Sequence, residues 1–272
     1  MVINVITRHA PTNYGSLLQA IATQRVIMNL GHECRIINYI PKCETGVRMA
    51  ITQLEQKTKW RRNPIKKAIY LMVAEPETLL MERKFLAMRK KYLLMGPCCA
   101  TTGELKKLYA EKKDEVFLTG SDQVWGPIST GHYDPTYFLD FVPKSSRKLA
   151  FAASFGKAIF DEQTLKEYRV LLKKYDSLAV RENVAVELLK KMDISAKQVL
   201  DPTLLMDADA WSEYVKPMKK PEKYVLVYQI HANSDLDHYA VKFAEKAELP
   251  LLRVSPLLHQ AKRSGKFVYC PD

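Results

Sequence analysis

Cysteine and histidine are scarce in this chain of 272 residues, and neither follows a metal-binding spacing. The five cysteines are odd in number and include no C-x-x-C pair, which argues against a disulfide framework and a zinc knuckle. This cysteine usage is typical of a reducing compartment. The six histidines include no H-E-x-x-H motif, so we predict that the protein has no structural metal.

Three further motifs are missing from the chain. There is no G-x-G-x-x-G after the first apolar segment, no G-x-x-x-x-G-K-[ST] and no G-x-S-x-G. Dinucleotide binding, P-loop hydrolysis and α/β-hydrolase chemistry therefore lose support. The N-terminus has no signal-peptide pattern, and no apolar run approaches the roughly 20 residues of a membrane-spanning helix. We expect a cytoplasmic protein with no resident cofactor.

Positive charge is concentrated in one quarter of the chain. Lys and Arg number 42 against 30 Asp and Glu, and the net charge is +12. Residues 42–113 hold 17 Lys/Arg and 7 Asp/Glu, which accounts for most of this excess. The segment has the pattern of long helices rich in Lys, Arg, Met and Leu, broken at Pro64, Pro76 and Gly96-Pro97. We predict a basic helical insertion at about 42–113.

Two partners suit such an insertion. The first is an anionic membrane: the segment would orient the protein peripherally, at the inner membrane surface, towards a lipid-linked acceptor. The second is a nucleic acid, supported by the mixture of charge and aromatic in Lys57–Arg62. No nucleic-acid motif accompanies it, so a nucleic acid is not the partner that we expect.

The remaining chain alternates between strand and helix patterns, with apolar residues making up 47% of the sequence. A strand at Val2–Ile6, a helix from Leu17 and a strand at Cys34–Ile40 form a βαβ unit. We predict an α/β fold: a doubly wound, mainly parallel, Rossmann-like sheet within residues 1–206. Its other strands are expected at Glu115–Thr119, Lys148–Ala153, Ser177–Val180 and Gln198–Leu200, with helices at Asp161–Lys174 and Asn183–Met192.

A second, partial α/β domain is predicted at 207–272. A helix at Asp207–Tyr214 and a charged, proline-flanked link precede strands at Tyr224–Tyr228, Leu251–Val254 and Lys266–Tyr269, with a helix at Leu236–Ala247. Three strands leave an exposed edge and little covered sheet, so we expect that the chain stops within this domain.

Polar residues gather at the carboxyl ends of the predicted strands, where open parallel sheets bind ligands. They are Asn13, Gly15 and Ser16; Ser121, Asp122, Gln123 and Trp125; Ser154; and Arg181. Asp122 is suited to accept a hydroxyl proton, Ser121 and Gln123 to orient polar groups, and Trp125 to face a sugar ring. Arg181 is suited to bind a carboxylate or phosphate.

Structural interpretations compete with each assignment. Asn13–Ser16 fits a capped helix with a turn glycine, and Asp122–Trp125 fits an Asx-type turn with a core tryptophan. Arg181 fits a local ion pair. We interpret Asp201-Pro202-Thr203 as a domain-boundary turn.

Taken together, several segments resemble the polysaccharide pyruvyl transferase family, in order over residues 1 to about 206 and more loosely beyond. They are Asn13–Ala20, Gly120–Trp125, Tyr137–Leu139 with Ala152–Gly156, Val180–Glu182 and Asp201–Leu205. The resemblance implies a GT-B-like pair of Rossmann-like domains. It also implies transfer of an enolpyruvyl-derived group from phosphoenolpyruvate to a glycan or lipid-linked oligosaccharide in exopolysaccharide biosynthesis, forming a pyruvate ketal. A nucleotide-sugar glycosyltransferase of GT-B fold is the alternative.

The resemblance implies roles for the candidate residues. Arg181 would bind the anionic donor, Asp122 would act as general base, and Gln123 and Trp125 would contact the acceptor. Asn13, Gly15, Ser16 and Ser154 would line the crevice. Two departures matter: Ser16 stands where many relatives have an acid, and the family's His-Gly step has no counterpart before the sequence ends. We therefore expect the 272-residue chain alone to be inactive or nearly so.

Overall fold

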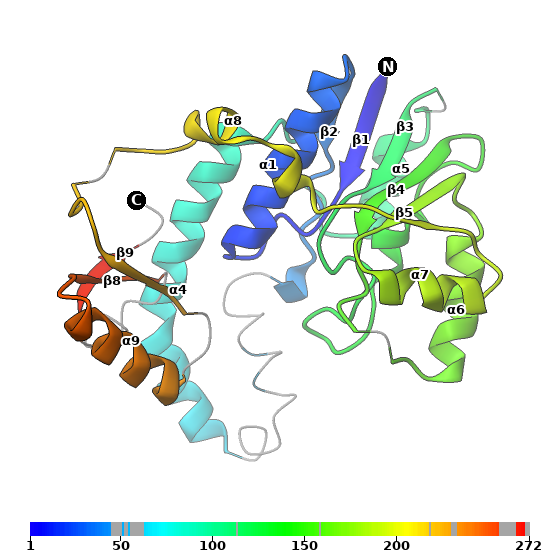
Figure 1. The fold of residues 1–272 in the computed structure, drawn as a ribbon. Helices are drawn as coiled ribbons and strands as arrows, with labels where there is room; N and C mark the ends of the chain where they lie inside the picture. The colour runs from blue at the N-terminus through cyan, green and yellow to red at the C-terminus, as the bar shows by residue number, and fades with distance from the viewer. Residues whose placement is uncertain are drawn as a thin grey trace.

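A parallel six-stranded sheet forms the larger part of the protein (Figure 1). The computed structural model describes residues 1–44, 51, 54, 63–112, 114–157, 159–217, 219–229, 233–255 and 265–269. The strand order is β2-β1-β3-β4-β5-β6, and every pair is parallel. The strands are β1 (Val2–Ile6), β2 (Glu33–Ile36), β3 (Val116–Thr119), β4 (Arg147–Ala153), β5 (Ser177–Val180) and β6 (Lys197–Gln198). The α/β, Rossmann-like prediction is confirmed.

Two apolar clusters cover the two faces of this sheet. On one face, α1 (Tyr14–Asn29) and α4 (Pro64–Tyr92) pack against β1, β2 and β3. On the other face lie α5 (Thr102–Tyr109), α6 (Glu162–Leu172) and α7 (Asn183–Lys191). Successive side chains of β3 point to opposite faces of the sheet, so Val116 and Leu118 belong to the first cluster and Phe117 to the second. Helices on both faces are the doubly wound arrangement that the sequence predicts.

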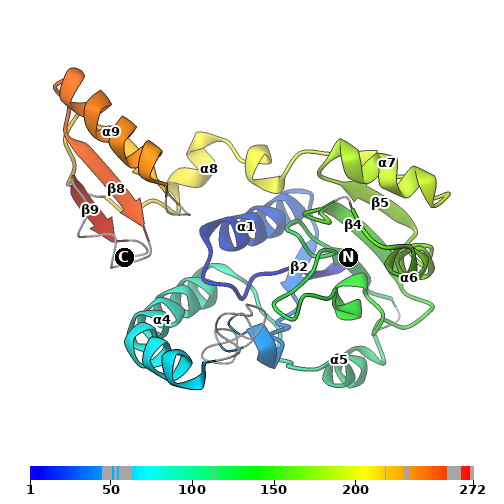
Figure 2. The same cartoon turned by 90° about the horizontal axis from the view of Figure 1, so that it is seen from below.

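The predicted basic insertion differs from expectation at Pro76. Helix α4 continues through this position as one element of 29 residues (Figure 2), so the predicted break is wrong. A proline costs one backbone hydrogen bond, and helix-forming residues on both sides keep the remaining bonds. The 3-10 helix η1 (Lys42–Glu44) precedes α4, and the Lys57–Arg62 segment lies outside the described residues. Among the described helices, none combines the length and apolar character needed to cross a bilayer.

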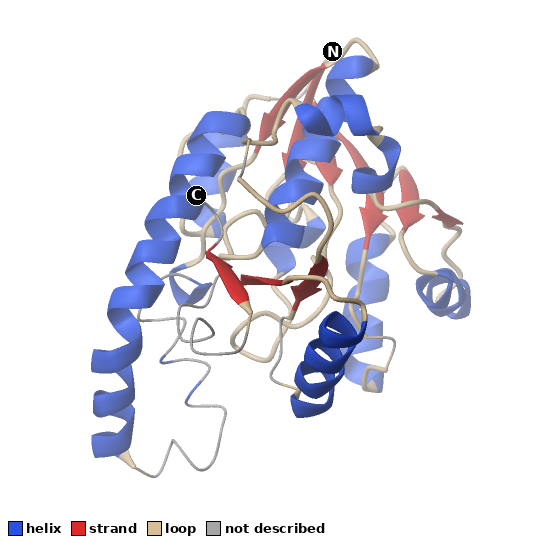
Figure 3. Ribbon diagram, turned by 60° about the vertical axis from the view of Figure 1, so that its left-hand side comes forward, coloured by secondary structure: helices blue, strands red, loops and turns tan. Residues whose placement is uncertain are grey.

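A second, three-stranded parallel sheet follows, in the order β7-β8-β9 (Figure 3). It consists of β7 (Val225–Tyr228), β8 (Leu251–Ser255) and β9 (Lys266–Tyr269), with α9 (Ser234–Lys246) packed on β7 and β8. The link between the two sheets contains the 3-10 helix η3 (Pro202–Leu205) and α8 (Ala208–Ser212), and α8 packs on the apolar cluster around β1 and α1. Another 3-10 helix, η2 (Pro135–Phe138), lies between β3 and β4. The domain boundary at 206 stays a prediction.

Candidate functional site

The strand order places a crevice at the carboxyl ends of β1 and β3. Strand order reverses between these neighbours, because β1 connects outward to β2 while β3 leads on to β4. In open α/β sheets, ligands bind at such a switch point. A cleft of about 190 Å³ lies here. It is lined by Asn13, Gly15, Ser16, Gln19, Asp122, Arg181, Asp201 and Thr203.

The start of α1 forms one wall of the cleft. Asn13 is the N-cap, and its side chain accepts a hydrogen bond from the Ser16 amide at 3.3 Å. Gln19 is buried one turn later, where its Nε2 donates to the Thr7 hydroxyl at 2.9 Å and to the Ser16 carbonyl at 2.8 Å. These bonds hold the β1–α1 loop in place beside the cleft.

Asp122 projects from the loop after β3. Its Oδ2 accepts a hydrogen bond from the Ser16 hydroxyl at 2.7 Å, and its Oδ1 accepts one from the Gln123 amide at 2.7 Å. The backbone at Asp122 has φ +89°, which is uncommon for a residue other than glycine. Such backbone strain persists where the surroundings over-determine it, often at functional sites. The carboxylate accepts from the amide of the next residue and not from the one two residues on, so the bond is not that of an Asx turn, and the role of Asp122 in a site stays a prediction.

Arg181 forms the opposite wall with Asp201. Its Nη1 donates to Asp201 Oδ2 at 3.0 Å, and its Nε donates to Glu182 Oε1 at 2.8 Å. Ser121 Oγ donates to the same Asp201 oxygen at 2.9 Å. Thr203 donates to Asp201 Oδ1 through both its amide and its hydroxyl. The cleft thus contains an ordered cation held between carboxylates.

The same contacts set the ionisation of this pair. Burial acts to lower the pKa of Arg181, but its hydrogen bonds with Glu182 and Asp201 outweigh burial and raise that pKa. Burial acts to raise the pKa of Asp201, but hydrogen bonds from Thr203, Arg181 and Ser121 hold it below its usual value. Both groups are therefore charged at neutral pH.

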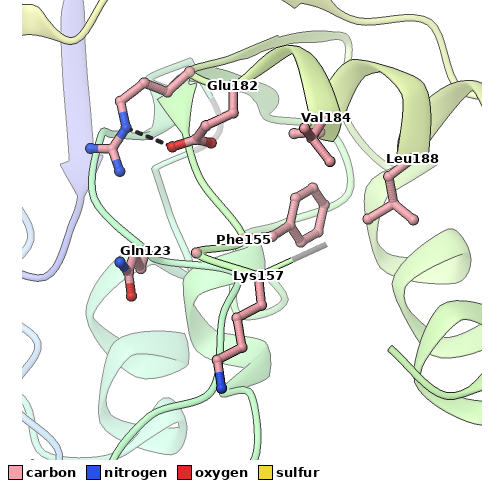
Figure 4. A pocket seen from close by; sticks show the side chains of 9 residues that line it. Gln123, Phe155, Lys157, Glu182, Val184 and Leu188 are labelled. Atoms are coloured by element: carbon pink, nitrogen blue, oxygen red, sulfur yellow. Dashed lines mark hydrogen bonds and ion pairs between the residues drawn. The ribbon is translucent and has the colours of Figure 1, made fainter. Parts of the chain in front are cut away.

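Arg181 also lines a second pocket, of about 240 Å³. Figure 4 shows this pocket. It is lined by Gln123, Phe155, Gly156, Lys157, Arg181, Glu182, Val184, Ala185 and Leu188. Gln123 stands at one side of this pocket, with Val184 and Leu188 at the other. The pocket combines Lys157, Arg181 and the carboxylate of Glu182 with an apolar floor. The first cleft places Asp122 and Asp201 beside the same arginine. Arg181 lines both.

The structure brings Asn13, Gly15, Ser16, Asp122 and Arg181 together in the first cleft. Gln123 lines the second pocket instead.

Three predicted contact residues are buried, and for them the prediction is wrong. Trp125 is 0% exposed and stacks on Phe138 with ring centroids 5.7 Å apart, so the core-tryptophan interpretation is the correct one. Ser154 is buried, and its hydroxyl accepts a hydrogen bond from the Gly156 amide. Ser121 is also buried, and it holds Asp201 in position instead of facing a ligand.

Asp201, Thr203 and Gln19 line the cleft but were not among the predicted site residues. The Asp201 corner was interpreted as a domain-boundary turn. The sequence did contain a signal for Asp201, because this polar residue follows the last strand of the sheet just as Asp122 follows β3. Among the described residues, no group of three or more His, Cys, Asp or Glu is arranged to hold a metal ion.

Fold and site together define an α/β protein whose parallel sheet carries an arginine–carboxylate cleft at its switch point. The sequence profile of the polysaccharide pyruvyl transferase family matches residues 13–266, nearly the whole chain. The chain therefore belongs to this family and is a transferase, with a polysaccharide as the acceptor that the family implies.

Solved structures with similar chain traces come from other families. One is UDP-N-acetylglucosamine 2-epimerase from Rickettsia bellii, with 11% identity, a TM-score of 0.40, and coverage of 99% of this chain and 68% of that chain. Another is Arabidopsis thaliana UGT89C1 complexed with quercetin, with 11% identity, a TM-score of 0.37, and coverage of 98% and 68%. A search of curated proteins returned no match.

Proposed function

We propose that the protein transfers a pyruvyl group from phosphoenolpyruvate to a sugar of a glycan, forming a ketal. The observation that carries this proposal is the position of Arg181 between two chemically different pockets. One pocket adds Lys157, Glu182 and an apolar floor. Glu182 is paired with Arg181, and the two cations with the apolar floor suit a small donor bearing a carboxylate, a phosphate and a methylene group. The other adds Asp122 and Asp201, which suits an acceptor rich in hydroxyl groups.

Arg181 has donors to spare for an anion. Its Nε and Nη1 are engaged by Glu182 and Asp201, and among the described residues no hydrogen bond involves its Nη2. A guanidinium held in this way is oriented before the ligand arrives, so less freedom is lost on binding. In the proposed reaction Arg181 neutralises the donor in the cleft.

Asp122 is the proposed general base. A proton from water adds to the donor methylene and gives a cation-like carbon, which an acceptor hydroxyl attacks while its own proton passes to Asp122. A C–O bond has then formed. Attack by a second hydroxyl breaks the bond between this carbon and the bridging phosphate oxygen, which takes up the proton of that hydroxyl, so hydrogen phosphate leaves with the ketal complete. The proton on Asp122 returns to water. The hydrogen bond from Ser16 orients the carboxylate of Asp122 for the first step.

Calorimetric titration of the chain with phosphoenolpyruvate tests the donor site. Arg181→Ala should weaken binding more than about tenfold, or about 1.4 kcal/mol, because a charge-assisted contact with the donor is lost. Arg181→Lys should lose less, because the charge remains. Arg169→Ala removes an exposed arginine of α6 that pairs with Asp193 and should bind like the parent. An unchanged affinity in Arg181→Ala would remove this residue from the site.

The same titration addresses the glycosyltransferase alternative. A nucleotide sugar such as UDP-glucose is added in place of phosphoenolpyruvate. We expect no heat of binding from the nucleotide sugar. If the nucleotide sugar binds and phosphoenolpyruvate gives no heat of binding, the glycosyltransferase alternative replaces the proposed function.

A further inference from the structure

The outer face of α4 carries a row of exposed aliphatic side chains. They are Ile65, Ile69, Leu79, Leu80 and Leu86, with exposed fractions from 72% for Ile65 to 39% for Leu86. At 3.6 residues per turn, these positions fall within about 120° of the helix circumference. They therefore lie on one side of the helix, two near its start and three in its second half, and we call these five residues the α4 stripe.

Ile65, Ile69 and Leu80 lie away from the face of α4 that packs on the protein, whereas Leu79 and Leu86 line a pocket beside that face. Met81 and Phe85 are buried on the opposite side of the helix, in the cluster around β1 and α1. A surface helix ordinarily carries polar residues on its outer side. Exposed aliphatic side chains gathered on one side of a helix mark an interaction site. Helix α4 lies along one side of the molecule (Figures 2 and 3).

Basic residues alternate with the aliphatic residues of the stripe. Arg83 and Lys90 are exposed within the same arc of the helix and Lys91 is exposed at its edge, and α4 contains seven Lys/Arg against three Glu. Aliphatic side chains interspersed with cations match the boundary between acyl chains and anionic headgroups. Binding of single-stranded nucleic acid relies instead on exposed aromatic rings. The five side chains of the stripe are all aliphatic, so a lipid surface fits better than a nucleic acid.

A third pocket connects the stripe with the β1–α1 loop. Leu79, Arg83 and Leu86 of α4 line this pocket of about 270 Å³, together with Ala10–Thr12. The next residue, Asn13, lines the Arg181 cleft. The third pocket and the Arg181 cleft are therefore lined by consecutive residues of the β1–α1 loop.

We propose that the α4 stripe docks the protein on an anionic phospholipid bilayer and thereby presents the cleft to a lipid-linked acceptor. The identity of the acceptor rests on the proposed function, whereas docking on the bilayer does not. The two ideas consequently fail in different experiments.

Vesicle sedimentation tests the docking. The chain is mixed with vesicles of phosphatidylglycerol and phosphatidylcholine, or of phosphatidylcholine alone, without phosphoenolpyruvate. The Ile69→Glu/Leu80→Glu variant places two acids in the stripe at exposed positions that do not line the third pocket. The matched control, Leu108→Glu/Val170→Glu, makes the same charge change at exposed positions of α5 and α6.

We expect the parent and the control to bind the anionic vesicles within twofold of each other, and the stripe variant to bind at least tenfold more weakly. Binding should fall at about 1 M salt, where the Debye length is about 3 Å, and should be weak to phosphatidylcholine alone. Failure of the parent to bind anionic vesicles overturns the proposal, as does equal loss in both variants. Binding of random single-stranded DNA with no vesicle binding would assign the basic segment to nucleic acid. Loss of phosphoenolpyruvate binding alone would contradict only the proposed function.

Discussion

Asp201 accepts hydrogen bonds from Ser121, Arg181 and Thr203, so one carboxylate joins the ends of three strands. Its proton affinity is low because these donors outweigh the cost of burial, and its pKa is below the usual value. Removing any one donor leaves the charge less compensated. At the scale of single residues, the carboxylate of Asp201 therefore helps to hold the Arg181 guanidinium in position.

Trp125 gives a residue-scale prediction about stability. Trp125→Ala should lower the free energy of unfolding by about 3–5 kcal/mol, because a fully buried ring is removed from a close-packed aromatic cluster. Urea unfolding measures this loss. Trp211→Ala, at a half-buried ring of α8, should cost less. A loss below about 1 kcal/mol with impaired sugar binding would restore the contact role.

At the scale of elements, the loops after β3 and β4 interlock. The Ser154 amide donates to the Asp122 carbonyl at 3.1 Å, and the Trp125 amide donates to the Ser154 carbonyl at 3.1 Å. The pairing of β4 with β5 shifts register between Ala150 and Ala153, and Ala152 has φ +55°. The irregular stretch ends at Ala153, which forms an isolated bridge with Asp122.

Gly126 tests this interlocking. A Cβ at this position would lie 2.5 Å from the Phe155 carbonyl oxygen, so Gly126→Ala should destabilise the fold by about 1–3 kcal/mol. Gly103→Ala in α5 is the control, because its nearest neighbour would be 3.9 Å away. Thermal unfolding should show a lower midpoint for Gly126→Ala and an equal or higher one for Gly103→Ala. Equal midpoints for Gly126→Ala and the parent would contradict the contact.

At the scale of the whole molecule, the site depends on segments far apart in the chain. The cleft combines the loop after β1, the loop after β3, the end of β5 and the segment after β6. Two apolar clusters on opposite faces of the sheet hold these strands in register. Global stability and site geometry are therefore coupled.

His9 predicts a pH dependence of global stability. It is buried between the Thr7 carbonyl and the Asn38 side chain, and burial, the largest influence, lowers its pKa. Below the pKa of about 6.5 that histidine has in the unfolded chain, the unfolded chain takes up a proton and the folded chain does not. The free energy of unfolding therefore decreases as the pH is lowered. The unfolding midpoint should decrease from pH 7 to about 5, and less in His9→Gln. Parallel profiles for the two proteins would contradict this assignment.

Local sequence patterns predicted several helices and strands well. The strands at Val2–Ile6 and Ser177–Val180 and the start of α7 at Asn183 were predicted at their observed bounds, because apolar periodicity is a property of neighbouring residues. Two predictions differ from the structure: the strand expected at Cys34–Ile40 ends at Ile36, and the helix on either side of Pro76 continues although a proline signals a break locally.

The sequence by itself determined the parallel α/β character and the polar strand ends from which the cleft is built. Only the tertiary structure decided which of these residues meet. Strand order placed β1 beside β3, so Ser16 reached Asp122, while close packing turned Trp125, Ser121 and Ser154 inward. The contact of Asp201 with Ser121 joins residues 80 positions apart. Such contacts depend on how whole elements pack, and a local pattern carries no record of that packing.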